Sequence, residues 1–145
     1  NRERFRFDIY GPIWDETLVR GWIAERGLDA IVTLKGFVPE AELDEALARL
    51  PGWEVRDNWL RRTFTTPGWP HTVMLVATIG YLAEAAWHHP DLSVGYAKVT
   101  VKLQTHRVRV VTYNDVELAA RIQEVILWTP SEESALDGFP KRWVH

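Results

Sequence analysis

Three of the five histidines in this 145-residue chain lie close together in the sequence. His88 and His89 are adjacent, His106 follows them, and Glu84 precedes His88 by four residues. On a helix, that spacing places Glu84 one turn back on the same face as His88. Imidazole titrates near neutral pH, so it can both accept and donate a proton within one turnover. Acid–base catalysis is therefore one chemistry for these residues, provided that the fold brings them into one cleft.

Two other interpretations of the histidines remain open from the residues alone. His88, His89 and Pro90 could end a helix, where imidazole bonds the last carbonyl groups and favours the negative end of the helix dipole. Three histidines could also bind zinc with an open coordination position. Adjacent histidines at a helix end, however, rarely aim both rings at one ion. His71 and His145 show no pattern that links them to the other three.

The elements that must position the histidines are a helix and a strand. From Pro70 to about Trp87, apolar residues recur at spacings of three and four on more than one face, which predicts a helix packed against a sheet. Pro90 disfavours helical geometry at the preceding residue, so we expect this helix to close at the histidine pair. Alternation over residues 96–105 predicts a strand with one solvated face. We expect residues 107–111 to pair with it as the second arm of a hairpin.

The rest of the central region completes a repeated order of elements. A helix is predicted from Pro39, because acidic residues follow the proline near the positive end of the helix dipole. Residues 53–65 predict a hairpin around Asp57 and Asn58, which tolerate the backbone of a tight turn. A last helix begins after Thr112 or Asn114 and runs to Ile126. The order α-β-β-α-β-β-α predicts an α+β fold, a four-stranded antiparallel sheet with helices packed on one face.

This order divides the chain into three parts. Residues 1–38 form an N-terminal extension, with a strand over 5–10, a helix from Asp15 to Gly27 and a second strand within 28–38. Residues 39–129 form the main domain. Residues 130–145 are rich in Ser, Glu, Gly and Pro, and we expect an extended or loose tail.

Composition excludes several classes of protein. The chain has no cysteine, which excludes disulfides, thiolate metal sites and a cysteine nucleophile. Seventeen Lys and Arg against 20 Asp and Glu give a net charge of −3, so the dense positive charge that nucleic acid requires is missing. No stretch approaches the roughly 20 apolar residues of a membrane-spanning helix, and the charged N-terminus does not look like a signal peptide. We expect a cytoplasmic protein with neither a nucleic-acid nor a membrane partner.

Taken together, these residues resemble the signature of a known family, the pterin-4a-carbinolamine dehydratases. The resemblance covers residues 40–128 and includes the predicted order of elements. It rests on the run Glu84-x-x-x-His88-His89-Pro90, followed by Tyr96, Thr105-His106 and Asp115-x-x-Leu118-Ala119.

The resemblance implies dehydration of 4a-hydroxytetrahydropterin to quinonoid dihydropterin by a hydro-lyase that needs no metal or redox cofactor. By similarity, His88 and His106 are the acid–base pair. His89 binds and orients the pterin ring, and Glu84 positions the histidines. The pathway implied is pterin biosynthesis or recycling.

Four further residues are implied in substrate binding. Backbone groups around Gln104 and Thr105 hydrogen-bond the pyrimidine edge, and Trp87 stacks near the pocket, with Trp69 as another candidate. Asp115 orients His106, or alternatively has a structural role at the start of the last helix.

The chain also departs from the family. Val110 stands where members usually have a glycine, whose backbone freedom valine lacks. The N-terminal extension and the tail lie beyond the usual domain. These features motivate an alternative function, a non-catalytic assembly or dimerisation factor of the Rubisco-assembly or transcriptional-cofactor type, with a protein partner bound through residues 1–38. For either function, the resemblance implies a homodimer or homotetramer, because unpaired sheet edges invite pairing.

Overall fold

The computed structural model of the chain describes residues 7–10, 16–35, 38 and 40–145. The predicted N-cap at Asp15 and the helix start at Pro39 lie outside these residues. No helix within the described ranges is both long enough and apolar enough to cross a membrane.

The N-terminal part contains a small strand–helix–strand unit. Strand β1 (Phe7–Tyr10) pairs in parallel with β2 (Val32–Lys35), and α1 (Glu16–Glu25) connects them. Gly27 follows α1 with a φ of 60°, a conformation that glycine adopts without a steric penalty. The strand, helix and second strand predicted for this part are therefore present where the structure describes it.

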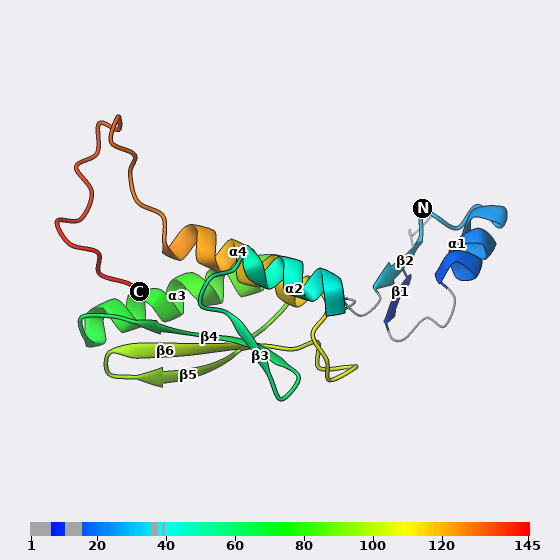
Figure 1. Cartoon of the computed structure of the whole chain (residues 1–145), viewed down its shortest axis with the longest axis horizontal. Helices are drawn as coiled ribbons and strands as arrows, with labels where there is room; N and C mark the ends of the chain where they lie inside the picture. The colour runs from blue at the N-terminus through cyan, green and yellow to red at the C-terminus, as the bar shows by residue number, and fades with distance from the viewer. Residues whose placement is uncertain (1–6, 11–15, 36–37, 39) are drawn as a thin grey trace, which may run out of the picture.

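The main sheet has four antiparallel strands in the order β3-β4-β6-β5, with helices on one face (Figure 1). This confirms the predicted α+β fold and its α-β-β-α-β-β-α order. The elements are α2 (Glu40–Ala48), β3 (Glu54–Arg56), β4 (Trp59–Thr65), α3 (Trp69–Ala86), β5 (Asp91–Gly95), β6 (Lys98–Leu103) and α4 (Tyr113–Ile126).

The first hairpin has the predicted turn. Asp57 and Asn58 have φ values of 53° and 62°, as the two central residues of a type I′ turn require. The turn fixes the register in which Val55 pairs with Leu60. This register puts Leu60 and Phe64 on the covered face of the sheet, where both side chains are fully buried.

The second hairpin differs from the prediction. Strand β6 pairs with β5, which precedes it, and residues 107–111 contribute only an isolated bridge between Thr105 and Val110. Pairing of Asp91 with Lys102 begins the β5–β6 ladder. The chain therefore leaves the histidine pair along β5 and returns along β6 to the same end of the sheet.

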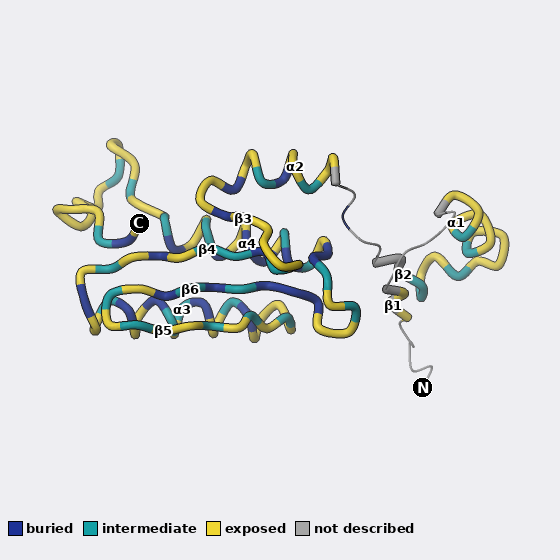
Figure 2. The backbone as a smooth tube through the Cα atoms, turned by 60° about the horizontal axis from the view of Figure 1, so that its bottom comes forward, coloured by how far each residue is buried: buried dark blue, intermediate teal, exposed yellow. Residues whose placement is uncertain are grey.

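The core lies between the covered face of the sheet and helices α3 and α4 (Figure 2). Its side chains come from alternate positions on the strands and from one face of each helix, as one-sided packing requires. The fully buried apolar residues include Leu60, Phe64, Leu75, Ile79, Val99, Val101, Leu103 and Ile122.

Of the two alternatives for the tail, extended or loose, the structure shows an extended segment whose last residues are docked on the domain. Val144 is buried in the core cluster, and Trp143 packs against that cluster. Two backbone hydrogen bonds join His145 and Thr65, at N···O distances of 2.8 and 3.1 Å. The tail therefore extends the edge of β4 beyond the short strand β3, although residues 127–145 contain no helix or strand.

Candidate active site

Helix α3 ends two residues before the histidine pair. Trp87 adopts a left-handed conformation, with φ 51° and ψ 38°. Its N–H donates to the Glu84 carbonyl, and the His88 N–H donates to the Ala83 carbonyl, both at 3.1 Å. This is the pattern of a Schellman motif. Backbone groups thus cap the helix, so the imidazoles are not needed for capping.

The His88 ring meets a buried carboxylate at the start of α4. His88 Nε2 lies 2.6 Å from Asp115 Oδ1, and the Asp115 side chain is fully buried. The backbone N–H of Thr112, the N-cap residue of α4, donates to Asp115 Oδ2 at 2.7 Å. The positive end of the helix dipole favours a carboxylate at this position. Asp115 therefore both caps α4 and holds His88.

Thr105 directs its polar groups into the protein. Its hydroxyl lies 3.1 Å from Asp115 Oδ2 and 2.7 Å from the Thr112 hydroxyl. Its N–H donates to the Val110 carbonyl, and its own carbonyl accepts from two N–H groups of the turn that follows. We expected Thr105 to offer backbone groups to a substrate, but these groups are already paired.

The His89 ring pairs with a different carboxylate. His89 Nε2 lies 2.9 Å from Glu84 Oε2, with side chains 52% and 68% exposed. The Trp87 ring meets the His89 ring edge-on, with centroids 5.5 Å apart. The helical spacing predicted Glu84 and His88 on one helix face. His88 lies beyond the end of α3, however, and Glu84 contacts His89 instead.

His106 is exposed at the start of the turn that follows Thr105. Its ring packs edge-on against Trp59, with centroids 6.0 Å apart, and the Lys102 ammonium lies 5.2 Å from the centre of the Trp59 ring. Among the described residues, no hydrogen bond joins His106 to Asp115. Sequence reasoning missed Trp59, although its place directly after the hairpin turn was a usable signal.

Two other expected residues lie in different settings. The Gln104 side chain is buried, and its Nε2 donates to the Asn58 carbonyl at 2.9 Å, so it braces the first hairpin turn. Trp69 begins the 18-residue helix α3. At 1.5 Å per residue, it lies about 25 Å from the end of that helix that carries the histidines.

The sheet register brings the three histidines to one end of the domain. His88 and Thr105 bind the same carboxylate, and His106 follows Thr105 directly. An open hollow of about 780 Å³ between α3 and α4 is lined by Trp87 and His88, but not by His89 or His106. Its other lining residues are Leu82, Ala85, Ala86, Asn114, Glu117, Leu118, Ala120, Arg121 and Glu124.

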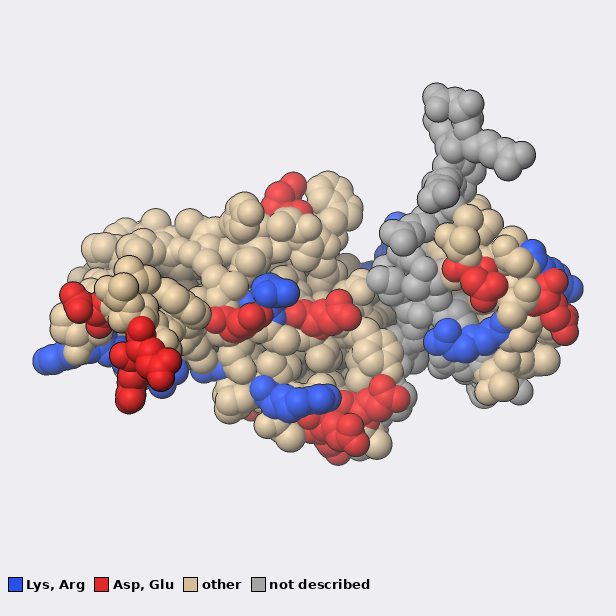
Figure 3. Space-filling view, turned by 90° about the horizontal axis from the view of Figure 1, so that it is seen from above, with Lys and Arg blue, Asp and Glu red and all other residues tan. Residues whose placement is uncertain are grey.

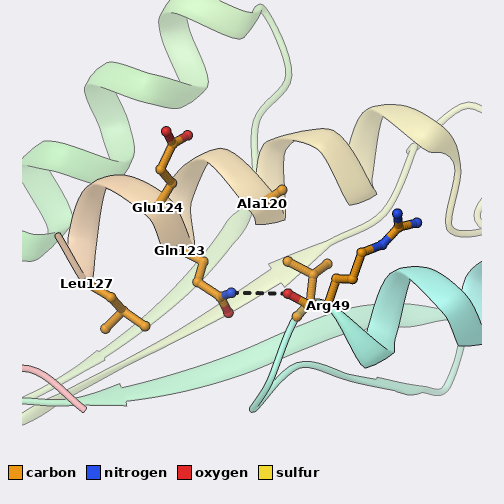
Figure 4. Close-up of a pocket in the computed structure, with 6 residues that line it drawn as sticks. Arg49, Ala120, Gln123, Glu124 and Leu127 are labelled. Atoms are coloured by element: carbon orange, nitrogen blue, oxygen red, sulfur yellow. Dashed lines mark hydrogen bonds between the residues drawn. The ribbon is translucent and has the colours of Figure 1, made fainter.

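A second hollow, of about 470 Å³, lies away from the histidines between α4 and the end of α2 (Figure 4). Gln123 spans it, with a long contact of 3.5 Å from its Nε2 to the Arg49 carbonyl. The Gln123 Oε1 accepts from Arg62 at 2.6 Å. Burial and the nearby Arg142 lower the pKa of the Arg62 guanidinium. This arrangement braces the helices against the sheet and contains no acid–base pair.

Neither the surface charge nor the arrangement of metal-ligating side chains points to a further site in the described residues. Figure 3 shows basic and acidic residues interspersed over the face that it presents, with no broad patch of one sign. Within the part of the chain that the structure describes, no three histidine, aspartate or glutamate side chains gather as metal ligands. The imidazoles and their carboxylates are groups in the site that can move protons.

Comparisons with known proteins agree with the residue pattern. A family model described as pterin 4 alpha carbinolamine dehydratase matches residues 37–125. A Roseiflexus castenholzii protein named for this dehydratase is 42% identical over 87 residues, covering 60% of this chain and 94% of the relative. A relative of the same name from Aquifex aeolicus is also 42% identical over 87 residues, covering 60% and 88%. A crystal structure titled as a transcriptional coactivator/pterin dehydratase from Brucella melitensis matches with a TM-score of 0.58 at 30% identity, covering 61% of this chain and 97% of that one.

Proposed function

Because this chain belongs to the pterin-4-alpha-carbinolamine dehydratase family, a family of hydro-lyases, we propose that it dehydrates a 4a-hydroxytetrahydropterin. The reaction breaks the C4a–O bond and removes a proton from a ring nitrogen, giving quinonoid dihydropterin and water. It therefore needs one acid for the leaving hydroxyl and one base for the nitrogen. The atoms and electrons balance without any other reactant.

His88 serves as the base in this proposal. An ionised carboxylate only accepts hydrogen bonds, so the contact with Asp115 requires that His88 Nε2 carry the proton. Neutral His88 then has its lone pair on Nδ1, where it can accept the proton of the pterin. The imidazolium that forms is stabilised by the buried carboxylate beside it, as in other aspartate–histidine pairs.

His106 serves as the acid, and His89 orients the substrate. His106 is exposed beside Trp59, and both its ring nitrogens are without a hydrogen-bond partner among the described residues. Its imidazolium can protonate the departing hydroxyl. His89 and Trp87 are exposed and meet edge-on, and the half-buried Trp59 ring lies beside His106, so these rings are surfaces on which a flat heterocycle can stack. The contact between His88 and the buried Asp115 is the observation that carries the proposal.

The test is dehydration of 4a-hydroxytetrahydropterin by the purified full chain. We expect a rate above the uncatalysed rate, and a loss of about a hundredfold or more in kcat in His88→Ala and in His106→Ala. His71→Ala is the matched control, because His71 packs against Phe139 and Trp143 in the tail and should leave kcat unchanged. A wild-type rate equal to the uncatalysed rate contradicts the proposal.

We also propose self-association through β5. This strand lies at the edge of the four-stranded sheet and carries mostly exposed side chains. An unpaired antiparallel edge favours pairing with a second copy. Sedimentation equilibrium should then give a mass of two or four chains. A monomer at every concentration contradicts this part of the proposal.

A second candidate function is a protein-docking role for the N-terminal unit. Within its described residues, Phe7, Ile9, Leu18 and Trp22 are large apolar side chains with exposed surface. Such a group favours a protein interface. The double variant Leu18→Glu, Trp22→Glu should lose a stoichiometric partner on purification from the native host and keep its dehydration rate. A partner that remains bound to this variant contradicts the docking role.

A further inference from the structure

Two buried hydroxyl groups lie behind the His88–Asp115 pair. We propose that Thr105 and Thr112 are positioning residues that hold the Asp115 carboxylate, and through it the His88 ring, in the orientation that leaves Nδ1 available to the substrate. This inference rests on the proposed function for its kinetic consequences. The hydrogen-bond network itself stands on geometry alone.

Asp115 Oδ2 is surrounded by donors. The Thr112 N–H lies at 2.7 Å, the Thr105 hydroxyl at 3.1 Å and the Thr112 hydroxyl at 3.2 Å. Oδ1 is left to His88 Nε2. The two oxygens therefore have separate tasks. Donors from Thr105 and Thr112 fix the position of Oδ2. The carboxylate plane is then set, and Oδ1 points at His88 Nε2.

The two hydroxyl groups act as a unit. Their oxygens are 2.7 Å apart, so one hydroxyl donates to the other while the second donates to Asp115. Whichever hydroxyl donates to its neighbour, Oδ2 retains a hydroxyl donor. Both threonines are buried, and β-branching restricts their side chains to few rotamers. Neither hydroxyl is therefore free for a ligand, and together they hold the carboxylate from two rigid side chains.

Thr105 also links the two halves of the proposed acid–base pair. It stands between β6 and His106, and its backbone closes the turn that follows through bonds to Val108, Arg109 and Val110. Its side chain reaches the carboxylate that holds His88. One residue thus sets the backbone from which His106 projects and the carboxylate that orients His88.

The experiment compares Thr105→Val with Thr105→Ser in the full chain. Val keeps the shape and removes the hydroxyl, and should lower kcat about tenfold with KM little changed, because misplacing a reacting group by a fraction of an ångström costs rate. Ser restores the hydroxyl and most of the rate. Thr72→Val is the matched control. It removes an equally buried hydroxyl, bonded to Tyr96 and Thr66 at the other end of α3, and should leave kcat unchanged.

A second kinetic measurement separates positioning from general damage to the fold. If Thr105 acts through Asp115 and His88, its replacement should cost nothing further in the His88→Ala background. Effects of residues that act as one unit are not additive. Equal losses in both backgrounds overturn the proposal.

Proton NMR provides a readout that does not depend on activity. The His88 Nε2 proton, in a 2.6 Å hydrogen bond to a buried carboxylate, should give a slowly exchanging downfield resonance. Thr105→Val should speed its exchange, and Thr105→Ser and Thr72→Val should not. If Thr105→Val proves unfolded, Thr112→Val is used instead, because it keeps the backbone N–H on Oδ2. An unchanged resonance with unchanged kcat overturns the inference. An inactive wild type that shows the predicted NMR pattern overturns the proposed function alone.

Discussion

Two adjacent histidines each contact a carboxylate through Nε2, but in different surroundings. We call His88 with Asp115 the inner pair and His89 with Glu84 the outer pair. The inner contact is 2.6 Å long and its carboxylate is fully buried, whereas the outer contact is 2.9 Å long and both side chains are more than half exposed. Water and salt screen an exposed ion pair and hardly reach a buried one. Only the inner pair is therefore expected to stabilise the fold and to fix a ring.

The inner and outer pairs differ because the backbone turns at a single residue, Trp87. Trp87 in its left-handed conformation turns the backbone at the end of α3, so that His88 faces α4 and His89 stays beside the last turn of its own helix. A fixed ring suits a base that must meet a proton at a defined position. An exposed ring suits a group that adapts to an arriving substrate.

The largest expected change in the free energy of unfolding follows from removing the carboxylate of the inner pair. Asp115→Ala removes the acceptor of His88, of one threonine hydroxyl and of the Thr112 N–H. Breaking a buried pair in this way should lower the free energy of unfolding by about 3 kcal/mol. Urea denaturation followed by circular dichroism measures it.

The outer carboxylate provides the control for this measurement. Glu84→Ala should change the free energy of unfolding by less than about 0.5 kcal/mol, because exposed ion pairs contribute little. If the two substitutions destabilise the protein equally, the distinction between inner and outer pairs is wrong.

An intermediate effect is expected at the turn between the two pairs. Trp87 is 79% exposed and has a φ of 51°, which is unfavourable for any residue with a Cβ. Trp87→Gly should therefore raise the free energy of unfolding by about 1 kcal/mol. The same variant should raise KM for the pterin if the ring stacks on substrate. A loss of stability would show that Trp87 makes contacts that outweigh its strain.

The smallest effect concerns the outer pair and salt. Glu84→Gln removes the charge and keeps a hydrogen-bond acceptor for His89. At low ionic strength it should cost about 0.3 kcal/mol, and in 1 M NaCl the difference from wild type should vanish. Thermal unfolding at the two salt concentrations measures it. A difference that persists in 1 M NaCl would mean that the outer pair is shielded from solvent.

Much of the fold follows from local sequence signals. Asp57 and Asn58 predicted a tight hairpin turn because both tolerate a positive φ, and the long apolar pattern after Pro70 predicted α3. The second hairpin could not be predicted from local signals. Residues 91–95 lack a strong strand pattern, and β5 forms because it pairs along β6. The two residues between β5 and β6, Tyr96 and Ala97, carry no turn signal.

The sequence predicted which residues belong to the site better than it predicted which of them contact one another. The sequence pattern and the family resemblance singled out His88, His89, His106 and Asp115. They placed Glu84 on the helix face of His88, and they gave Asp115 either to His106 or to a structural role at the start of the last helix. The structure instead joins Glu84 to His89 and Asp115 to His88. Spacing along a helix determines contacts only while the helix continues, and α3 ends at Ala86. Contacts between α3 and α4 depend on packing, which no local pattern specifies.

The backbone hydrogen bond between the tail and β4 makes the Thr65 amide a reporter of tail opening. The Thr65 N–H donates to the His145 carbonyl at the end of β4 that lies away from the histidines. Its hydrogen-exchange rate therefore follows how often the last residues lift from the core and withdraw Val144. Substrate binding and tail opening can then be followed separately in one protein sample, at opposite ends of the same sheet.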